Sequence, residues 1–357
     1  MSDELRSEID AWIAEHWDPD ATVAEWWQRL ADSGFTNPSL RPPFGHGWGR
    51  AETRVLAEAI RSGGAIGAPA GLGMQLAAPT ILEHGTDDQI DRIVPGILNG
   101  QDCWCQLFSE PGAGSDLAGL QTRAERDGDE WVVSGQKVWT SEGQFADWGM
   151  LIARTDPTAP KHRGISWFAF AMNQPGVEVR PLREMTGRSL FNEVFFNEAR
   201  VSANNLIGDV NDGWRVANTT LMVERAGFGG GHGMAYAPAR PGRIAGHLER
   251  PAGPFRNKRP ALTAGGVGSG MLTTLTDRAR EHDLLEDSVM RQQLAGVHSD
   301  IELMRFSARR GRVRAQQTGG EGNLASLRTT SALHRARDAA GAILGPEMTL
   351  SGPDSET

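Results

Sequence analysis

The 357-residue sequence lacks most of the features that mark secreted, membrane and metal-binding proteins. It has only two cysteines, Cys103 and Cys105, so a disulfide framework is not expected, and two thiols without His or Cys partners nearby make a poor zinc site. It has no apolar run of the ~18 residues that a transmembrane helix needs. The acidic start, Met1-Ser2-Asp3-Glu4, lacks the charged-then-apolar pattern of a signal peptide. These absences predict a cytoplasmic protein without a metal site.

Basic residues are fewer than acidic residues in this sequence. The 36 Lys and Arg residues against 45 Asp and Glu give a net charge of −9. A general nucleic-acid or membrane-surface partner is therefore not expected. The chain is too long for one small core, so two or three subdomains are expected.

The spacing of apolar residues divides the chain into three predicted domains, which together indicate an α+β fold. Helical spacing runs through residues 1–100, period-two alternation through 101–210, and helical spacing again through 211–357. The middle part predicts a small antiparallel barrel or sandwich, with strands near 104–108, 149–154, 165–172, 177–180 and 193–196. A stretch rich in Pro and Arg at about 237–260 predicts an irregular surface loop inserted into the last domain. Helices are expected to follow at about 271–315 and 324–344.

The most informative stretch begins at Trp104 and ends at Asp116. A strand-like segment leads into Ser109-Glu110-Pro111-Gly112-Ala113-Gly114-Ser115-Asp116, where Pro and Gly require a turn. The backbone N–H groups of such a turn are nearly bare, so they can bind a phosphate, with the Ser115 hydroxyl as a further donor. By itself, a short Gly-Ser sequence is more often a plain turn after a strand.

A second motif covers Trp131 to Ser141 and predicts a strand, a turn at Gly135 and a second strand. With the first motif it resembles the acyl-CoA dehydrogenase family, and the similarity extends with gaps from about Leu56 to Gly231. The resemblance implies an N-terminal helical domain, a middle β-domain and a C-terminal helical bundle, with FAD between the last two. It also implies a reaction, in which an acyl-CoA thioester loses its α-proton to a carboxylate and its β-hydrogen as hydride to flavin N5, giving a trans-2-enoyl-CoA.

The resemblance further implies which residues contact FAD. Trp139 matches the aromatic residue that flanks the flavin ring, and Ser141 matches the hydroxyl that reaches N5. Ser115 matches a position near both the FAD pyrophosphate and the thioester substrate. The full implied set is Gln106, Phe108, Ser109, Gly114, Ser115, Trp139 and Ser141. Taken alone, Trp139 is more readily explained as an ordinary aromatic residue of the β-domain.

The predicted catalytic base is Glu224. It shares one face of a predicted helix with four apolar or small residues, namely Trp214, Ala217, Leu221 and Phe228. A carboxylate on such a face is usually either functional or held in an ion pair, and both alternatives are open here. The run Leu-Met-Val-Glu-Arg resembles the isovaleryl and long-chain branches of the family, which implies that Glu224 is the base and that Arg225 binds substrate.

The implied partners are an acyl-CoA substrate, an electron-transfer flavoprotein or a similar acceptor, and further subunits. A homo-oligomer is expected, and the predicted helix over Val289–Phe306 offers a face for it. Three family elements are missing before Thr357: the Arg-x-x-Phe-Gly element, the C-terminal Gly-Gly-Thr loop and the last helix. Their absence favours an alternative, a non-catalytic or half-site subunit that pairs with a complete homologue. An oxygen-using flavoenzyme on the same fold is a third hypothesis.

Overall fold

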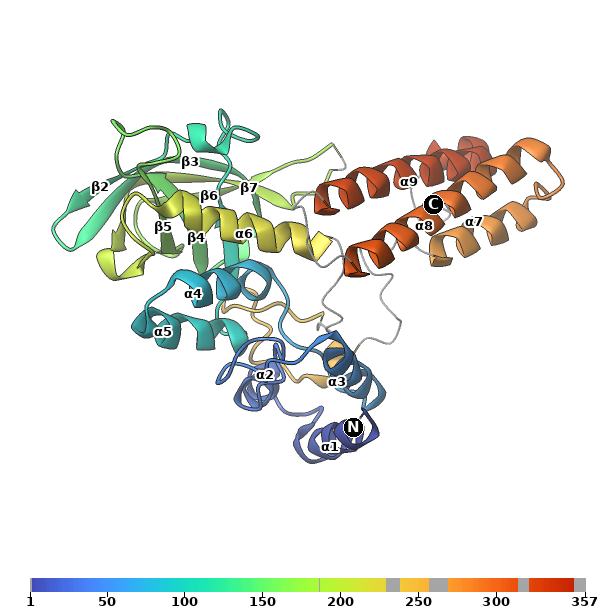
Figure 1. Cartoon of the computed structure of the whole chain (residues 1–357), viewed down its shortest axis with the longest axis horizontal. Coiled ribbons are helices and arrows are strands. Elements are labelled where there is room, and N and C mark those ends of the chain that lie inside the picture. Colours follow the sequence, from blue (N-terminus) through green and yellow to red (C-terminus); the bar gives the residue numbers. More distant parts are fainter. Residues whose placement is uncertain (1, 186, 229–237, 257–268, 314–320, 350–357) are drawn as a thin grey trace. The chain divides into compact units, whose positions relative to one another are not determined.

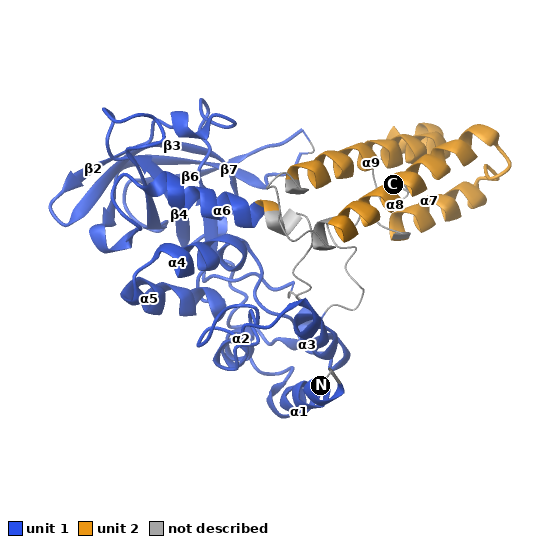
Figure 2. Cartoon of the chain, viewed as in Figure 1, with its two compact units in different colours: residues 1–224, 232–258 blue, residues 225–231, 259–357 orange. Residues whose placement is uncertain are grey.

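The chain forms two compact units, each with its own core (Figure 2). The first unit comprises residues 1–224 and 232–258, and the second comprises 225–231 and 259–357. The computed structural model describes residues 2–185, 187–228, 238–256, 269–313 and 321–349. Helices, then strands, then helices follow one another along the chain, which confirms the α+β class (Figure 1). The three predicted domains stay a prediction, since a grouping into two units does not test their boundaries.

Helices build the N-terminal part of the first unit. They are α1 (Ser2–His16), α2 (Val23–Asp32), α3 (Arg50–Ser62), the π-helix η1 (Gly73–Ala77), α4 (Ala78–His84) and α5 (Asp87–Leu98). Capping boxes at Thr22 and Thr86 begin α2 and α5 and satisfy their first backbone N–H groups. Trp26 and Trp27 are fully buried between these helices.

The strands form one sheet. They are β1 (Trp104–Leu107), β2 (Arg123–Asp127), β3 (Glu130–Ser141), β4 (Trp148–Arg154), β5 (Ile165–Ala171), β6 (Val177–Leu182), β7 (Phe191–Ser202) and β8 (Leu206–Ile207). Their order is β6-β7-β3-β2-β4-β5-β8, with β1 beside β4. Most pairings are antiparallel as predicted, but β2 meets β4 in parallel at one residue pair, and β1 runs parallel to β4 along its whole length. This parallel pairing is possible because β2 and β3 intervene along the chain and supply the long connection that parallel neighbours need.

The motif from Trp131 to Ser141 is not a hairpin, and that prediction is wrong. It is the single long strand β3, with a shift in its register against β7 between Val133 and Gly135. Gly135 has a φ of 150°, and a side chain there would collide with Thr122. The glycine therefore permits a bulge and a close approach of two backbones rather than a reversal of the chain.

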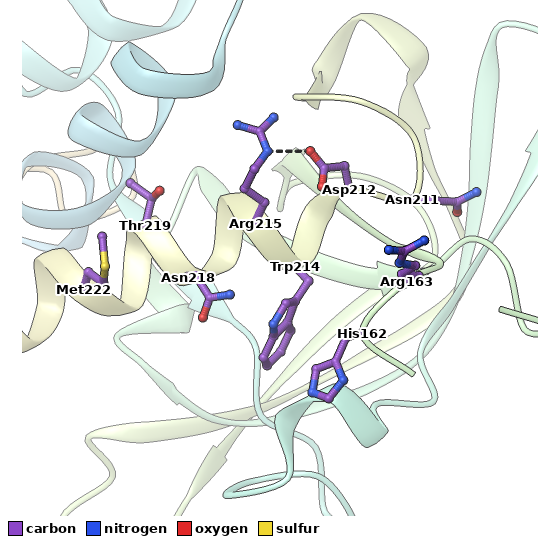
Figure 3. Close-up of a pocket in the computed structure, with 9 residues that line it drawn as sticks. All are labelled: His162, Arg163, Asn211, Asp212, Trp214, Arg215, Asn218, Thr219 and Met222. Carbon is purple, nitrogen blue, oxygen red and sulfur yellow. Dashed lines mark hydrogen bonds and ion pairs between the residues drawn. The ribbon is translucent and has the colours of Figure 1, made fainter. Parts of the chain in front are cut away.

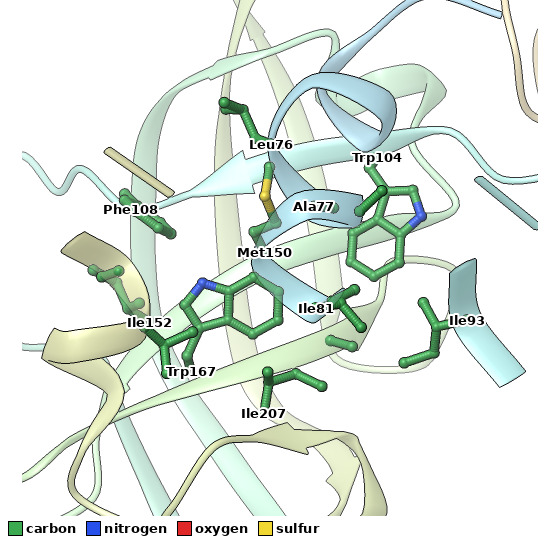
Figure 4. Packing of buried hydrophobic residues seen from close by; sticks show 14 of the residues in the cluster. Leu76, Ala77, Ile81, Ile93, Trp104, Phe108, Met150, Ile152, Trp167 and Ile207 are labelled. Atoms are coloured by element: carbon green, nitrogen blue, oxygen red, sulfur yellow. The ribbon is translucent and has the colours of Figure 1, made fainter. Parts of the chain in front are cut away.

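Helix α6 (Gly213–Phe228) joins α4 and α5 in covering one side of the sheet (Figure 1). Its Val216 and Ala217 are fully buried in the same core cluster as the tryptophans of β1 and β5, Trp104 and Trp167 (Figure 4). A hydrogen bond between the hydroxyls of Thr80 and Thr220, at 3.0 Å, also joins α4 to α6. The helix that carries Glu224 is thus fixed against the sheet.

The segment 238–256 is irregular, as predicted, but it is not a surface loop. Its Ala239, Leu248 and Ala252 are buried in the core of α1, α2 and α3. The backbone N–H of Val23 donates to the carbonyl of Arg250 at 2.9 Å, which ties the segment to the start of α2. The prediction failed because the segment contains few apolar residues, and those few decide where it packs.

The second unit is made of helices α7 (Ser269–Glu281), α8 (Ser288–Val313) and α9 (Glu321–Leu344). Leu275, Leu294 and Val297 belong to its core. The helices predicted at about 271–315 are α7 and α8, and Asp287 caps the start of α8 by accepting from two backbone N–H groups. None of the helices in the described ranges is long and apolar enough to cross a membrane.

Candidate functional site

The turn that follows β1 is short and open. The backbones of Glu110 and Ala113 exchange two hydrogen bonds of 3.0 Å, which closes the turn. A side-chain carbon added at Gly112 or Gly114 would meet no atom within 4 Å. Ser115 is exposed beside them. Space above the turn is therefore free for a ligand, and phosphate binding there stays a prediction.

A buried ion pair lies beneath this turn. The Nζ atom of Lys137 lies 2.8 Å from Oε1 of Glu110, and the Lys137 side chain is fully buried. Burial lowers the pKa of Lys137 to about 8, although the neighbouring Glu110 opposes that shift. Lys137 and the backbone N–H groups that donate to Glu110 outweigh the cost of its burial, so its pKa lies below the ordinary value. The sequence analysis missed this pair, although each motif contributes one of the two charges.

Trp139 and Ser141 lie near the end of β3. The pairing of β3 with β7 is irregular between Lys137 and Thr140, and Trp139 has a φ of 60°. Its indole is 61% exposed and meets the ring of Phe191 edge to face, with 5.8 Å between centroids. Ser141 is half-buried. A large aromatic side chain exposed from a left-handed position is uncommon, so this strand end is suited to contact a flat ligand.

Phe108 and Ser109 directly follow β1, and their expected contact with FAD stays a prediction. The Phe108 side chain is buried in the core cluster beneath the sheet (Figure 4), and its carbonyl accepts from Lys137 Nζ at 2.9 Å. Ser109 is half-buried, and its carbonyl accepts from the backbone N–H of Val138 at 2.9 Å. Both carbonyls bind β3, which leaves the Ser109 hydroxyl as the side-chain donor that this pair can offer a ligand.

Glu224 lies opposite β1. The side-chain Nε2 of Gln106 is 3.5 Å from Oε2 of Glu224, so the structure brings the predicted base and one predicted cofactor residue together. Both side chains are half-buried. Of the other residues predicted on this helix face, Ala217 is buried, and Trp214 and Leu221 pack partly against the core. The Phe228 side chain lies outside the described residues. Arg225 is exposed and belongs to the second unit.

A groove whose lining includes two arginines, a histidine and an aspartate was not predicted (Figure 3). His162 and Arg163, from the connection between β4 and β5, line it together with Trp214 and Arg215 of α6. The rings of His162 and Trp214 meet edge to face at 4.9 Å, and Arg215 Nε donates to Asp212 at 2.6 Å. The groove has a volume of about 480 Å³, within the range of small-molecule sites.

This groove lies beside the first turn of α6, and the N-terminal end of a helix favours anions. The sequence did hold a signal for it, the run Lys161-His162-Arg163 before a strand. A basic run of three residues usually forms a solvated loop, and only the fold brings this one against α6.

Comparison with protein-family models identifies the family to which this chain belongs. Residues 1–101 match the model described as acyl-CoA dehydrogenase, N-terminal domain, and residues 105–199 match acyl-CoA dehydrogenase, middle domain. The chain belongs to the acyl-CoA dehydrogenase family. This is a family of flavoprotein oxidoreductases of lipid metabolism, and the resemblance drawn from the two motifs is confirmed.

Individual relatives support the assignment. The chain is 46% identical over 247 residues to acyl-CoA dehydrogenase FadE34 of Mycobacterium tuberculosis, covering 69% of this chain and 34% of that protein. It is 38% identical over 265 residues to acyl-CoA dehydrogenase IpdE1 of Mycolicibacterium smegmatis, covering 66% of this chain and 67% of that protein. Among solved structures, the ChsE4-ChsE5 complex from Mycobacterium tuberculosis matches with a TM-score of 0.69 and 26% identity, over 98% of this chain and 86% of that one.

The residues present are compatible with FAD, the cofactor that the family implies. The open space above Gly112 and Gly114 leaves backbone N–H groups accessible to a pyrophosphate. The exposed indole of Trp139 offers an aromatic surface of the kind that a flavin ring packs against. The hydroxyls of Ser109, Ser115 and Ser141 are donors that such a ring and its phosphates can use.

Proposed function

We propose that this protein catalyses the FAD-dependent α,β-dehydrogenation of an acyl-CoA thioester to a trans-2-enoyl-CoA. The observation that carries this proposal is the carboxylate of Glu224, half-buried on α6 and within 3.5 Å of the Gln106 amide. A general base needs to be held close to its substrate while its carboxylate stays able to accept a proton. Membership of the acyl-CoA dehydrogenase family supports the same reaction.

In the proposed reaction, Glu224 removes the proton from the α-carbon of the thioester. The Gln106 amide donates to Oε2 of Glu224 and so orients the carboxylate. Bound FAD supplies the two-electron acceptor for the β-hydrogen. The groove of His162, Arg163 and Arg215 binds the anionic nucleotide end of CoA, as its charge and its position beside the first turn of α6 suit phosphates.

The remaining parts of the proposal concern cofactor contacts and partners. Gly114 and Ser115 bind the FAD pyrophosphate, Trp139 packs against the flavin and Ser141 donates to it. Arg225 contacts the substrate. An electron-transfer flavoprotein or a similar carrier takes up the electrons. A cytoplasmic location agrees with the two free, buried thiols of Cys103 and Cys105.

The test compares the parent protein with Glu224→Gln, which keeps the size of the side chain and removes the base. Both proteins should bind FAD and fold alike. In anaerobic stopped-flow experiments with an acyl-CoA that bleaches the parent flavin, the variant should reduce its flavin at least ~100-fold more slowly. If the variant reduced its flavin at the parent rate, the base would have to be another residue. If the variant failed to fold, the alternative that Glu224 is held in a structural ion pair would be favoured.

A second candidate function is a half-site or non-catalytic subunit within a heteromer. The match to a structure described as a complex of two proteins, ChsE4 and ChsE5, favours it. Light scattering and the visible spectrum separate the candidates. A flavin-loaded homo-oligomer agrees with the first, whereas a colourless protein that gains flavin only with a co-expressed homologue agrees with the second.

A further inference from the structure

The ion pair of Glu110 and Lys137 is the most deeply buried charged contact of the first unit's described residues. Lys137 has no exposed surface, and the Glu110 side chain is only 7% exposed. Lys137 Nζ donates both to Oε1 of Glu110 at 2.8 Å and to the carbonyl of Phe108 at 2.9 Å. The proposed reaction gives neither residue a chemical step, so their role requires another explanation.

Glu110 joins the two ends of the turn. Its Oε2 accepts from the backbone N–H of Gln121 at 2.6 Å, and its Oε1 accepts from that of Thr122 at 2.9 Å. The carboxylate thus binds the chain after the turn while its own backbone closes the turn by pairing with Ala113. One side chain therefore fixes the entry and the exit of the loop that contains Gly112, Gly114 and Ser115.

Lys137 connects this loop to the aromatic end of β3. It is two residues before Trp139, just where the regular pairing of β3 with β7 is interrupted. The adjacent Val138 N–H donates to the carbonyl of Ser109 at 2.9 Å, so the strand is held to the turn at neighbouring residues. The direction in which Trp139 leaves the strand depends on how this part of β3 is anchored.

Stability alone does not account for the pair. Replacing a buried ion pair by uncharged residues of similar size is often neutral or stabilising, because both charges must lose their water. We propose that Glu110 and Lys137 are positioning residues, which set the ligand-binding turn and Trp139 in one fixed relation to each other. This inference rests on the proposed function, since FAD is the ligand for which turn and ring are aligned.

The test uses the double variant Glu110→Gln with Lys137→Met, which removes both charges and nearly preserves side-chain volume. Its melting temperature should fall only moderately, because the desolvation cost of both charges is removed while backbone groups that Glu110 and Lys137 bind lose a partner. The backbone N–H groups of Gln121 and Thr122 should exchange with deuterium at least roughly 10-fold faster than in the parent, because they lose a charged acceptor. The Kd for FAD, from titration of the stripped protein, should rise at least roughly 10-fold for the same reason, with a shift of the visible flavin band.

Arg200→Met is the matched control. Arg200 joins Asp127 at 3.0 Å and Glu130 at 2.9 Å, an exposed contact at the other end of β3, and its loss should change neither the Kd for FAD nor exchange at Gln121. If the double variant does not fold, Lys137→Gln, which retains a donor for Phe108, is measured in its place and should also raise the Kd.

The outcomes distinguish the two claims. If the parent binds FAD and the double variant has the same Kd, flavin band and amide exchange, the positioning role is wrong. The proposed function would then remain intact. A parent that binds no FAD at all would contradict the proposed function, and the positioning role would fall with it. A folded variant with faster exchange and weaker FAD binding would support the inference.

Discussion

Leu248→Ala tests whether the segment 238–256 belongs to the core of the first unit. Leu248 is 4% exposed and packs among the residues of α1, α2 and α3. Removing three carbons from such a site costs both the transfer free energy and a cavity, about 2–5 kcal/mol in total. A mid-range loss of about 3 kcal/mol corresponds to a fall of roughly 6–12 °C in the melting temperature for a unit of this size.

The assay is thermal unfolding followed by far-ultraviolet circular dichroism, with two controls. Ile244→Ala removes a side chain of the same segment that is 53% exposed, and its effect should stay within about 0.5 kcal/mol. Leu56→Ala removes a fully buried residue of α3 in the same core and should resemble Leu248→Ala. If Leu248→Ala melted like Ile244→Ala while Leu56→Ala melted lower, the segment would not be part of this core.

Three further predictions concern the candidate site. Trp139→Ala removes a ring that is 61% exposed, so stability should hardly change while the Kd for FAD rises roughly 10-fold in a fluorescence titration; an unchanged Kd would contradict the assigned contact. Arg163→Ser should raise the KM for an acyl-CoA at least roughly 10-fold but not that for the corresponding acyl-pantetheine, which lacks the nucleotide; equal changes would exclude the groove as the nucleotide site. The pKa of Lys137 is about 8 in the folded protein and ordinarily 10.5. At a pH between these two values, Lys137 binds its proton more often in the unfolded chain than in the folded protein. The free energy of unfolding, from urea titrations at pH 8 and pH 10, should therefore rise with pH relative to the Glu110→Gln, Lys137→Met double variant, and a fall would refute the sign.

Local spacing was enough to predict much of the fold. Helical spacing predicted helices in residues 1–100, and alternation predicted β4 and β5 within a residue or so at their ends. Those signals come from residues that are close in sequence and lie on the same face of one helix or strand. The bulge at Gly135 was mistaken for a turn because a glycine within an alternating strand is compatible with either structure, and only its contact with Thr122 decides.

Long-range pairing explains what sequence reasoning missed. The segment 238–256 packs against helices more than 170 residues earlier in the chain, and three buried residues, Ala239, Leu248 and Ala252, direct it there. The ion pair of Glu110 and Lys137 likewise joins two motifs, and neither motif alone reveals that its charge is buried. The burial of the Phe108 side chain depends on the layers that cover the sheet, which its own segment does not specify, and its expected contact with FAD stays a prediction.

Two carboxylates lie near the proposed site, and their surroundings suit them to different tasks. Glu110 is committed to Lys137 and to two backbone N–H groups, all within 2.9 Å, which stabilise its anion and lower its pKa. Such a carboxylate is poorly suited to accept a proton, because protonation would break contacts that hold the turn. Within the described part of the chain, Glu224 has one long hydrogen bond, from Gln106 at 3.5 Å, and it is half-buried rather than enclosed. Its carboxylate is therefore not committed to holding the fold, which is why we place the base on α6 and the anchor on the turn.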